Sequence, residues 1–232
     1  VPLNQVVSAT FNEKMNSVTI TDESFTLQQG ETNVEGAHSY NNVTASLAPS
    51  SPLLPFKLYT GRVKTSVKDL MGNSLQEEYV WTFTTIPQIT LSSNPEIGGT
   101  TLGAGTFNQD SLIMVNATPN SGYSFLNWSE NGTIVSTNSA FEHKMAGNTA
   151  LIANFTLQLV VATSSNPTAG GTTLGAGSYN TGTSVTLEAV PNTGYTFTNW
   201  TEGVNIGSSN ANYTFDITVN RTMVANFDAN TA

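Results

Sequence analysis

Trp128 and Trp200 are the residues in this sequence best suited to bind a ligand. Each follows an alternating aromatic segment and lies beside Asn, Ser or Thr, and Glu. An exposed indole on a β-strand can stack on a sugar ring while its polar neighbours hydrogen-bond the hydroxyls. A buried indole would instead pack between strands. Simple alternation puts Trp200 on the same face as Thr196 and Thr198, so ligand contact and packing both remain open.

Groups that could perform catalysis are sparse. The chain has no cysteine, which removes thiol nucleophiles, thiolate metal sites and disulfides. Its two histidines, His38 and His143, are far apart in the sequence. Glycoside hydrolysis needs two carboxylates, yet only one acid, Glu130 or Glu202, follows each of the two tryptophans. We therefore expect a protein that is not an enzyme, with no catalytic residue and no bound cofactor.

A structural calcium ion is the one metal that the sequence leaves open. Asp69, Asn73, Glu77 and Glu78 lie near one predicted loop, and oxygen ligands of this kind bind calcium. The dense alternation of acidic residues that is typical of calcium loops is missing. A bound calcium is therefore a minor alternative.

The composition indicates an exported protein. Seven Lys and Arg face 16 Asp and Glu, a net charge of −9, which argues against nucleic-acid binding. Charged residues make up only 10% of the chain, so its surface must be neutral and polar. No apolar run approaches the length of a membrane span. Because the chain lacks a start Met and a signal segment, we interpret it as an excerpt of a longer secreted or cell-surface protein.

The second half of the chain is an internal repeat. Gly98–Gly105 recurs letter for letter at Gly170–Gly177, and the motif that ends at Trp128 recurs at Trp200. The offset is 72 residues throughout, with no insertion, and 27 of 62 aligned positions are identical between 94–155 and 166–227. The sequence therefore predicts two copies of one domain.

The elements that must position these residues are β-strands. Apolar and polar residues alternate in Ser184–Ala189 and Tyr213–Ile217, as expected for half-buried strands. We predict an all-β chain in three parts: a sandwich over 1–86 and small β-rich repeats over 87–157 and 158–232. The joints are short and are not Gly/Ser-rich, so we expect a stiff, elongated arrangement.

The first part resembles the bacterial Ig-like domain of the Big_5 type, which implies a β-sandwich found in S-layer and other surface proteins. The segments that carry this resemblance are Val1–Gln5, Ser8–Met15, Ser24–Leu27, Pro49–Leu53, Lys68–Leu75 and Trp81–Thr85.

Each 72-residue copy resembles the divergent internalin-type B repeat. The motifs are Asn-Pro-x-x-Gly-Gly, Gly-x-Gly-x-Phe/Tyr, Pro-Asn-x-Gly-Tyr-x-Phe-x-Asn-Trp and Ala-Asn-Phe. Better-known B repeats have a β-grasp fold, but no helix is evident here, so a β-grasp and a sandwich both remain open. The resemblance implies spacers, stalks and adhesive modules, with no catalytic site common to the family.

Together these observations predict a non-enzymatic stalk, spacer or adhesion region. Its partners would be other domains of the same longer chain, and a glycan or protein on a host or cell surface. The alternative is a carbohydrate-binding accessory region of a secreted enzyme or adhesin, in which Trp128 and Trp200 contact the sugar.

Overall fold

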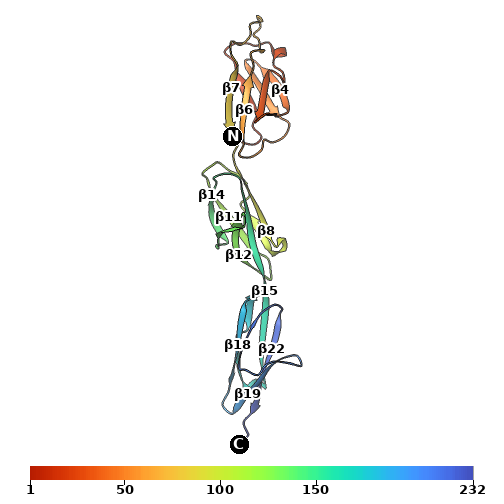
Figure 1. Cartoon of the computed structure of the whole chain (residues 1–232), viewed down its shortest axis with the longest axis vertical. Helices are drawn as coiled ribbons and strands as arrows, with labels where there is room; N and C mark the ends of the chain where they lie inside the picture. The colour runs from red at the N-terminus through yellow and green to blue at the C-terminus, as the bar shows by residue number, and fades with distance from the viewer. Residues whose placement is uncertain (232) are drawn as a thin grey trace. The chain divides into compact units, whose positions relative to one another are not determined.

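A computed structural model describes residues 1–231 and is built almost entirely of β-strands (Figure 1). The helical segments among these residues are three short 3-10 helices, so the all-β prediction is confirmed. None of the described residues belongs to a helix that could cross a membrane. The chain forms two compact units. One comprises Val1–Thr90, Gly103–Val115 and Glu142–Ala150, and the other comprises Leu91–Leu102, Asn116–Phe141 and the chain from Leu151 onward.

The first domain is a sandwich of two antiparallel sheets. Its strands are β1 (Val7–Thr10), β2 (Phe25–Gln29), β3 (Thr32–Asn33), β4 (Gly36–Asn41), β5 (Thr44–Pro49), β6 (Leu58–Val63) and β7 (Tyr79–Thr84). One sheet has the order β1-β5-β4 and the other the order β3-β2-β6-β7. The bacterial Ig-like architecture expected from the sequence is thereby confirmed.

Alternation along these strands builds the core of the sandwich. Val7 and Ala9 of β1 are buried while their neighbours are exposed, because successive side chains of a strand point to opposite faces. Phe25 and Leu27 of β2 and Tyr59 of β6 meet them from the other sheet, almost fully buried.

The first repeat has eight strands. They are β8 (Gln88–Asn94), β9 (Gly99–Leu102), β10 (Gly105–Thr106), β11 (Leu112–Pro119), β12 (Tyr123–Glu130), β13 (Thr133–Ser136), β14 (Ala140–Lys144) and β15 (Thr149–Asn166). β9, β11 and β14 form one sheet, and the remaining strands join the other. A hairpin turn at Asn131-Gly132 connects β12 to β13, with φ angles of 49° and 81° at its two central residues.

The second repeat has the same plan. Its strands are β16 (Gly171–Leu174), β17 (Gly177–Asn180), β18 (Ser184–Pro191), β19 (Tyr195–Glu202), β20 (Asn205–Ser208), β21 (Asn212–Asp216) and β22 (Arg221–Ala229). β16, β18 and β21 form the small sheet, while β17, β22, β19 and β20 join β15 in the large one. Buried residues of both sheets, among them Leu187 and Phe227, form the core between them. With no α-helix among the described residues, each repeat is a two-sheet fold and not a β-grasp.

One strand belongs to both repeats. Leu151–Leu157 of β15 pairs with β12, and Gln158–Asn166 pairs with β17 and β22 of the second repeat (Figure 1). The sequence predicts a three-residue joint between Phe155 and Leu159, but these residues continue the strand without a break. β15 is therefore the last strand of one copy and the first of the next.

Candidate functional site

Trp128 and Trp200, the two candidate ligand-binding residues, are buried. The exposed fraction of each is 0%. The indole N–H of Trp128 donates to the carbonyl oxygen of Ser139 at 3.0 Å, and that of Trp200 to Ala211 at 3.1 Å. No ring face remains for a sugar to stack on. Both side chains are therefore packed inside the repeats, which is the second of the two interpretations that the sequence leaves open.

A β-bulge explains why simple alternation does not place these tryptophans correctly. Phe125 pairs with Phe155 and Asn127 pairs with Asn154, so Leu126 is an extra residue in β12. An inserted residue shifts the following side chains to the opposite face. Trp128 therefore lies on the same face as Phe125, with ring centroids 6.1 Å apart. The second repeat has the same bulge, and Phe197 and Trp200 lie 6.0 Å apart.

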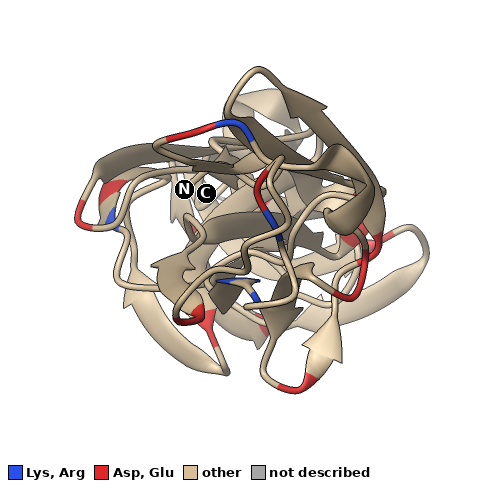
Figure 2. Cartoon of the chain, turned by 90° about the horizontal axis from the view of Figure 1, so that it is seen from above, with Lys and Arg blue, Asp and Glu red and all other residues tan. Residues whose placement is uncertain are grey.

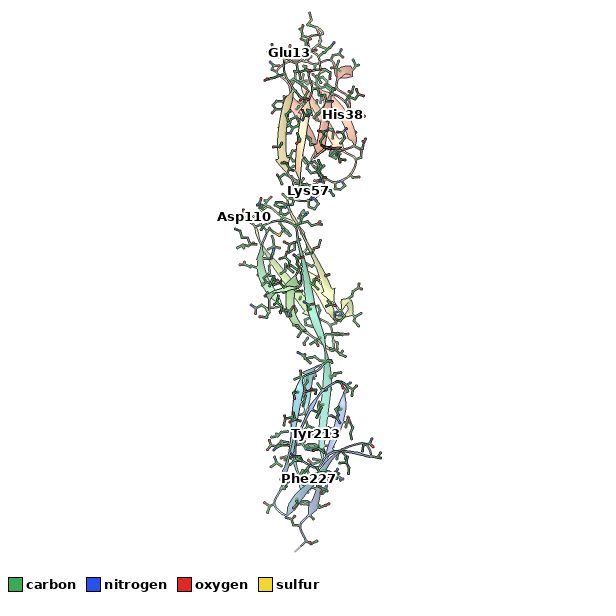
Figure 3. All side chains as sticks on the ribbon, in the orientation of Figure 1. Glu13, His38, Lys57, Asp110, Tyr213 and Phe227 are labelled. Carbon is green, nitrogen blue, oxygen red and sulfur yellow. The ribbon has the colours of Figure 1, made fainter. Side chains whose placement is uncertain are left out.

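The Gly-Gly motif of each repeat makes room for a phenylalanine. In the second repeat, a Cβ atom on Gly170 would lie 2.7 Å from the side chain of Phe227, and one on Gly171 would lie 2.5 Å from the same ring. Phe227 is labelled in Figure 3 and belongs to the Ala-Asn-Phe motif of β22. Two motifs that are far apart in the sequence therefore form one packing contact.

The asparagines of three repeat motifs form one hydrogen-bond network. The Asn226 side-chain amide donates to the Asn199 side-chain oxygen Oδ1 at 2.8 Å and to the Thr201 hydroxyl at 3.1 Å. The Asn166 side-chain amide donates to Asn226 Oδ1 at 3.0 Å. Asn154, Asn127 and Asn94 repeat this arrangement in the first copy. A network of this kind satisfies the amides of half-buried strands. These asparagines have a structural role.

Glu202 is paired with an arginine. The Arg221 guanidinium donates two hydrogen bonds to one Glu202 oxygen, at 2.7 and 3.0 Å, and lowers the pKa of that carboxyl. The guanidinium also lies 4.3 Å from the centroid of the Phe215 ring and contacts Tyr213, which is labelled in Figure 3. Glu202 is therefore a member of an ion pair.

Three of the four residues considered for calcium are engaged in hydrogen bonds or an ion pair. The Asp69 carboxylate accepts hydrogen bonds from the Asn73 side chain and from the backbone N–H groups of Asn73 and Met71, and the Asn73 amide lowers the pKa of Asp69. Glu78 pairs with Arg62. No group of three acidic or histidine side chains that could hold a metal occurs within residues 1–231.

The two histidines lie in different domains. His38, labelled in Figure 3, donates from Nε2 to the Phe25 carbonyl oxygen at 2.7 Å, and its Nδ1 lies 3.0 Å from the Asp22 carboxylate. His143 lies on β14, where its ring nitrogen contacts the Thr149 hydroxyl.

Charges are spread thinly over the chain. The chain has seven Lys and Arg and 16 Asp and Glu. Figure 2 draws the former in blue and the latter in red. The cationic side chains of Arg62, Lys144 and Arg221 are each paired with a carboxylate. A basic surface of the kind that binds nucleic acid is therefore not formed by these residues.

A recess with an aromatic lining lies in the first domain, between β1 and β7. A cavity of about 420 Å³ is lined by Phe11, Leu75, Tyr79 and Trp81 with several polar neighbours. A second cavity of about 280 Å³ continues past Trp81 to Phe83 and Val1. We call the two together the β1–β7 groove. Trp81 lies across Gly61 of β6 and stacks with Tyr79, with ring centroids 5.3 Å apart. The Trp81 side chain is nevertheless only partly buried.

Comparison with known proteins identifies both kinds of domain. The family model described as a bacterial Ig-like domain matches residues 1–85. The model described as a divergent InlB B-repeat domain matches residues 89–158 and 161–231. No curated protein matches the chain.

Solved structures of bacterial surface layers match the chain weakly. The N-terminal part of the bacterial S-layer protein SbsC is 14% identical, with a TM-score of 0.32, over 97% of this chain and 42% of that one. Domains 1–6 of the surface layer protein SbsC are 12% identical, with the same TM-score, over 100% of this chain and 40% of that one. The chain thus spans about two fifths of the length of these proteins.

Proposed function

Because the chain belongs to the divergent InlB B-repeat family and carries a bacterial Ig-like domain ahead of the repeats, we propose that it is a non-enzymatic spacer of a secreted or cell-surface protein. In this role it holds or presents another part of the longer protein at a distance. Its partners are the neighbouring domains of that protein. Both matched domain types are surface modules, and neither is an enzymatic family.

The observation that carries the proposal is the shared strand β15. A spacer must resist bending where its domains join, and a loop of Gly and Ser would not do so. Here the join is a strand that is hydrogen-bonded to β12 on one side of Leu157 and to β17 on the other. The Leu157 carbonyl also accepts hydrogen bonds from the backbone and the hydroxyl of Thr181, both at 3.0 Å.

The join between the first domain and the first repeat is also hydrogen-bonded. The side chain of Asn148 donates to the Pro55 carbonyl oxygen at 3.0 Å and accepts from the backbone N–H of Gln88 at 3.0 Å. One amide therefore connects a loop of the sandwich, the connecting segment and the repeat. Such contacts favour a defined geometry at the join.

The carbohydrate-binding alternative loses its main support. It was motivated by Trp128 and Trp200, and both rings are enclosed within the repeats. Without an exposed aromatic platform at those positions, the spacer is the better-supported function.

Small-angle X-ray scattering of the full chain tests the spacer proposal. We expect an elongated particle with a narrow spread of maximum dimensions. A matched variant with a Gly/Ser segment inserted between Leu157 and Gln158 should scatter as a broad set of conformations, because the insertion breaks β15. A compact particle, or identical scattering from the two chains, would contradict the proposal.

A further inference from the structure

The ring of His38 is held between the two sheets of the sandwich. His38 lies on β4, the outermost strand of one sheet, and its Nε2 lies 2.7 Å from the Phe25 carbonyl oxygen on β2 of the other sheet. The imidazole and the Phe25 ring also pack edge to face, with centroids 5.7 Å apart. These two contacts fix the orientation of the imidazole.

The contact with Phe25 decides which ring nitrogen carries hydrogen. A carbonyl oxygen can only accept, so Nε2 of His38 carries a hydrogen and donates it. In an imidazole with a single hydrogen, Nδ1 then presents a lone pair. This lone pair faces the carboxylate of Asp22, whose Oδ1 lies 3.0 Å from Nδ1. Two electron-rich atoms therefore face each other, and a cation between them would be attracted to both.

Unsatisfied polar atoms identify the same place independently. Among residues 1–231, the buried side-chain polar atoms without a hydrogen bond are His38 Nδ1 and Thr26 Oγ1. The contact of Nδ1 with Asp22 is thus short enough for a hydrogen bond but lacks the geometry of one. All three residues line one cavity of about 40 Å³. Because buried polar atoms normally have partners, two exceptions beside one cavity indicate a bound ion or water.

The distance from His38 Nδ1 to Asp22 Oδ1 distinguishes an ion from a water molecule. A metal ion about 2.1 Å from two atoms that lie 3.0 Å apart has an angle of about 90° between them. This is the angle between neighbouring ligands of an octahedral ion. For a water molecule about 2.8 Å from each atom, the angle would be about 65°. That angle is much narrower than the one between the two O–H bonds of water.

We propose that His38 Nδ1 and the Asp22 carboxylate bind a divalent first-row transition-metal ion such as Ni²⁺. An imidazole together with a carboxylate suits these ions, whereas Ca²⁺ and Mg²⁺ take oxygen ligands. The Phe25 carbonyl oxygen orients the ligating ring, and histidines that bind metals usually have such a partner on the other nitrogen. No third acidic or histidine side chain within residues 1–231 joins the group, so water molecules complete the coordination.

The ion would link two elements of the first domain. Asp22 lies in the turn before β2, and His38 lies on β4 of the opposite sheet. An ion that binds both side chains only in the folded state stabilises the sandwich by mass action. The proposal goes beyond the spacer function and does not depend on it, because the ion acts within one domain and not at a join.

Titration of the full chain with Ni²⁺, after treatment with a chelator and dialysis, tests the site. Calorimetry measures the Kd, and broadening of imidazole NMR signals by paramagnetic Ni²⁺ shows which histidine binds. We expect one ion per chain, selective broadening of the His38 signals, and a rise in Tm. His143, on β14, is the internal reference, and its signals should stay sharp. Ca²⁺ should produce none of these changes.

Two substitutions of neighbouring acids separate the ligand from general charge. Asp22→Asn removes the carboxylate from a side chain that is 90% exposed, so the fold should be retained. It should weaken Ni²⁺ binding at least about tenfold. Glu23→Gln removes the same charge at the next exposed position and should change the Kd by less than about twofold.

Equal weakening by the two substitutions, or equal broadening of the His38 and His143 signals, would overturn the proposal and indicate an adventitious ion only. Binding of Ca²⁺ as tightly as Ni²⁺ would overturn the choice of a transition metal. A His38 ring that carries hydrogen on both nitrogens at neutral pH and binds no Ni²⁺ would also overturn the proposal. The contact with Asp22 would then be an ion pair.

Discussion

Trp200 is tied to Ala211 by a hydrogen bond from its indole N–H to the backbone carbonyl oxygen, and Trp128 makes the same bond to Ser139. A buried indole with a satisfied N–H stabilises the core through both its area and its polar atom.

We expect Trp200→Ala to lower the free energy of unfolding by about 3–5 kcal/mol, because it leaves a large cavity and an unpaired carbonyl. Chemical denaturation measures this loss. Val204→Ala, at a side chain 97% exposed in the neighbouring hairpin, is the matched control and should change stability by less than about 0.5 kcal/mol. An equal effect of the two substitutions would contradict the burial of Trp200.

Gly171→Ala should destabilise the second repeat by about 1–3 kcal/mol, because the added Cβ collides with the Phe227 ring and with the Val190 carbonyl oxygen. Thermal unfolding followed by circular dichroism measures the change. Thr172→Ala, at the next and exposed position, should have little effect. A neutral Gly171→Ala would show that Gly171 is not packed against Phe227.

Asn226→Asp should destabilise the repeat at neutral pH by about 1–3 kcal/mol, because a carboxylate would replace the amide that donates to Asn199 and Thr201. Part of this loss should be recovered on acidification, when the new carboxyl is protonated and can donate once. Asn212→Asp, on an exposed strand position, controls for added charge. If the difference in stability between Asn226→Asp and this control does not change with pH, the hydrogen-bond network is contradicted.

The ion pair of Glu202 and Arg221 predicts a pH dependence. Arg221 lowers the pKa of the folded Glu202 carboxyl below its ordinary value of 4.5, so the contribution of the pair is present above that value and is lost as the pH falls through the folded pKa. The pair is partly exposed to solvent, so this contribution is about 0.2–1 kcal/mol. In Arg221→Met, stability should decline less between pH 5 and pH 3 than in the unsubstituted chain. Equal declines in the stability of the two proteins over this pH range would contradict this prediction.

Calcium gives a simple test of the Asp69 loop. The carboxylate of Asp69 already accepts three hydrogen bonds from the loop that it closes. We therefore expect the Tm to be the same in calcium and in a chelator. Asp69→Asn should lower the Tm under both conditions, because the acceptor of the Met71 and Asn73 N–H groups is weakened. A rise in Tm on addition of calcium would contradict this expectation and show that the loop binds the ion.

Much of the fold could be predicted from the sequence because period-two alternation is a local property. Tyr213–Phe215 and Val185–Leu187 alternate as the structure has them, and the duplication is evident from identity alone. The position of Trp128 could not be predicted in this way. The bulge at Leu126 depends on pairing with β15, which is distant in sequence, and the bulge alone decides which face the indole occupies.

The β1–β7 groove could not be predicted from the sequence either. The alternation of Trp81 with Phe83 does indicate that both side chains lie on one face of the strand. Whether an inward face is covered depends on which strands are neighbours, and a local pattern carries no information about that.

The strand β15 also constrains how such a chain can grow or shrink in evolution. Since the end of one copy is the beginning of the next, a duplication in whole units of 72 residues needs no newly invented linker. A single residue inserted within Leu151–Asn166 would instead move every later side chain of the strand to the opposite face. The side chains that β15 buries in the following copy would then face solvent. The length of β15 is therefore constrained by its pairing in both copies.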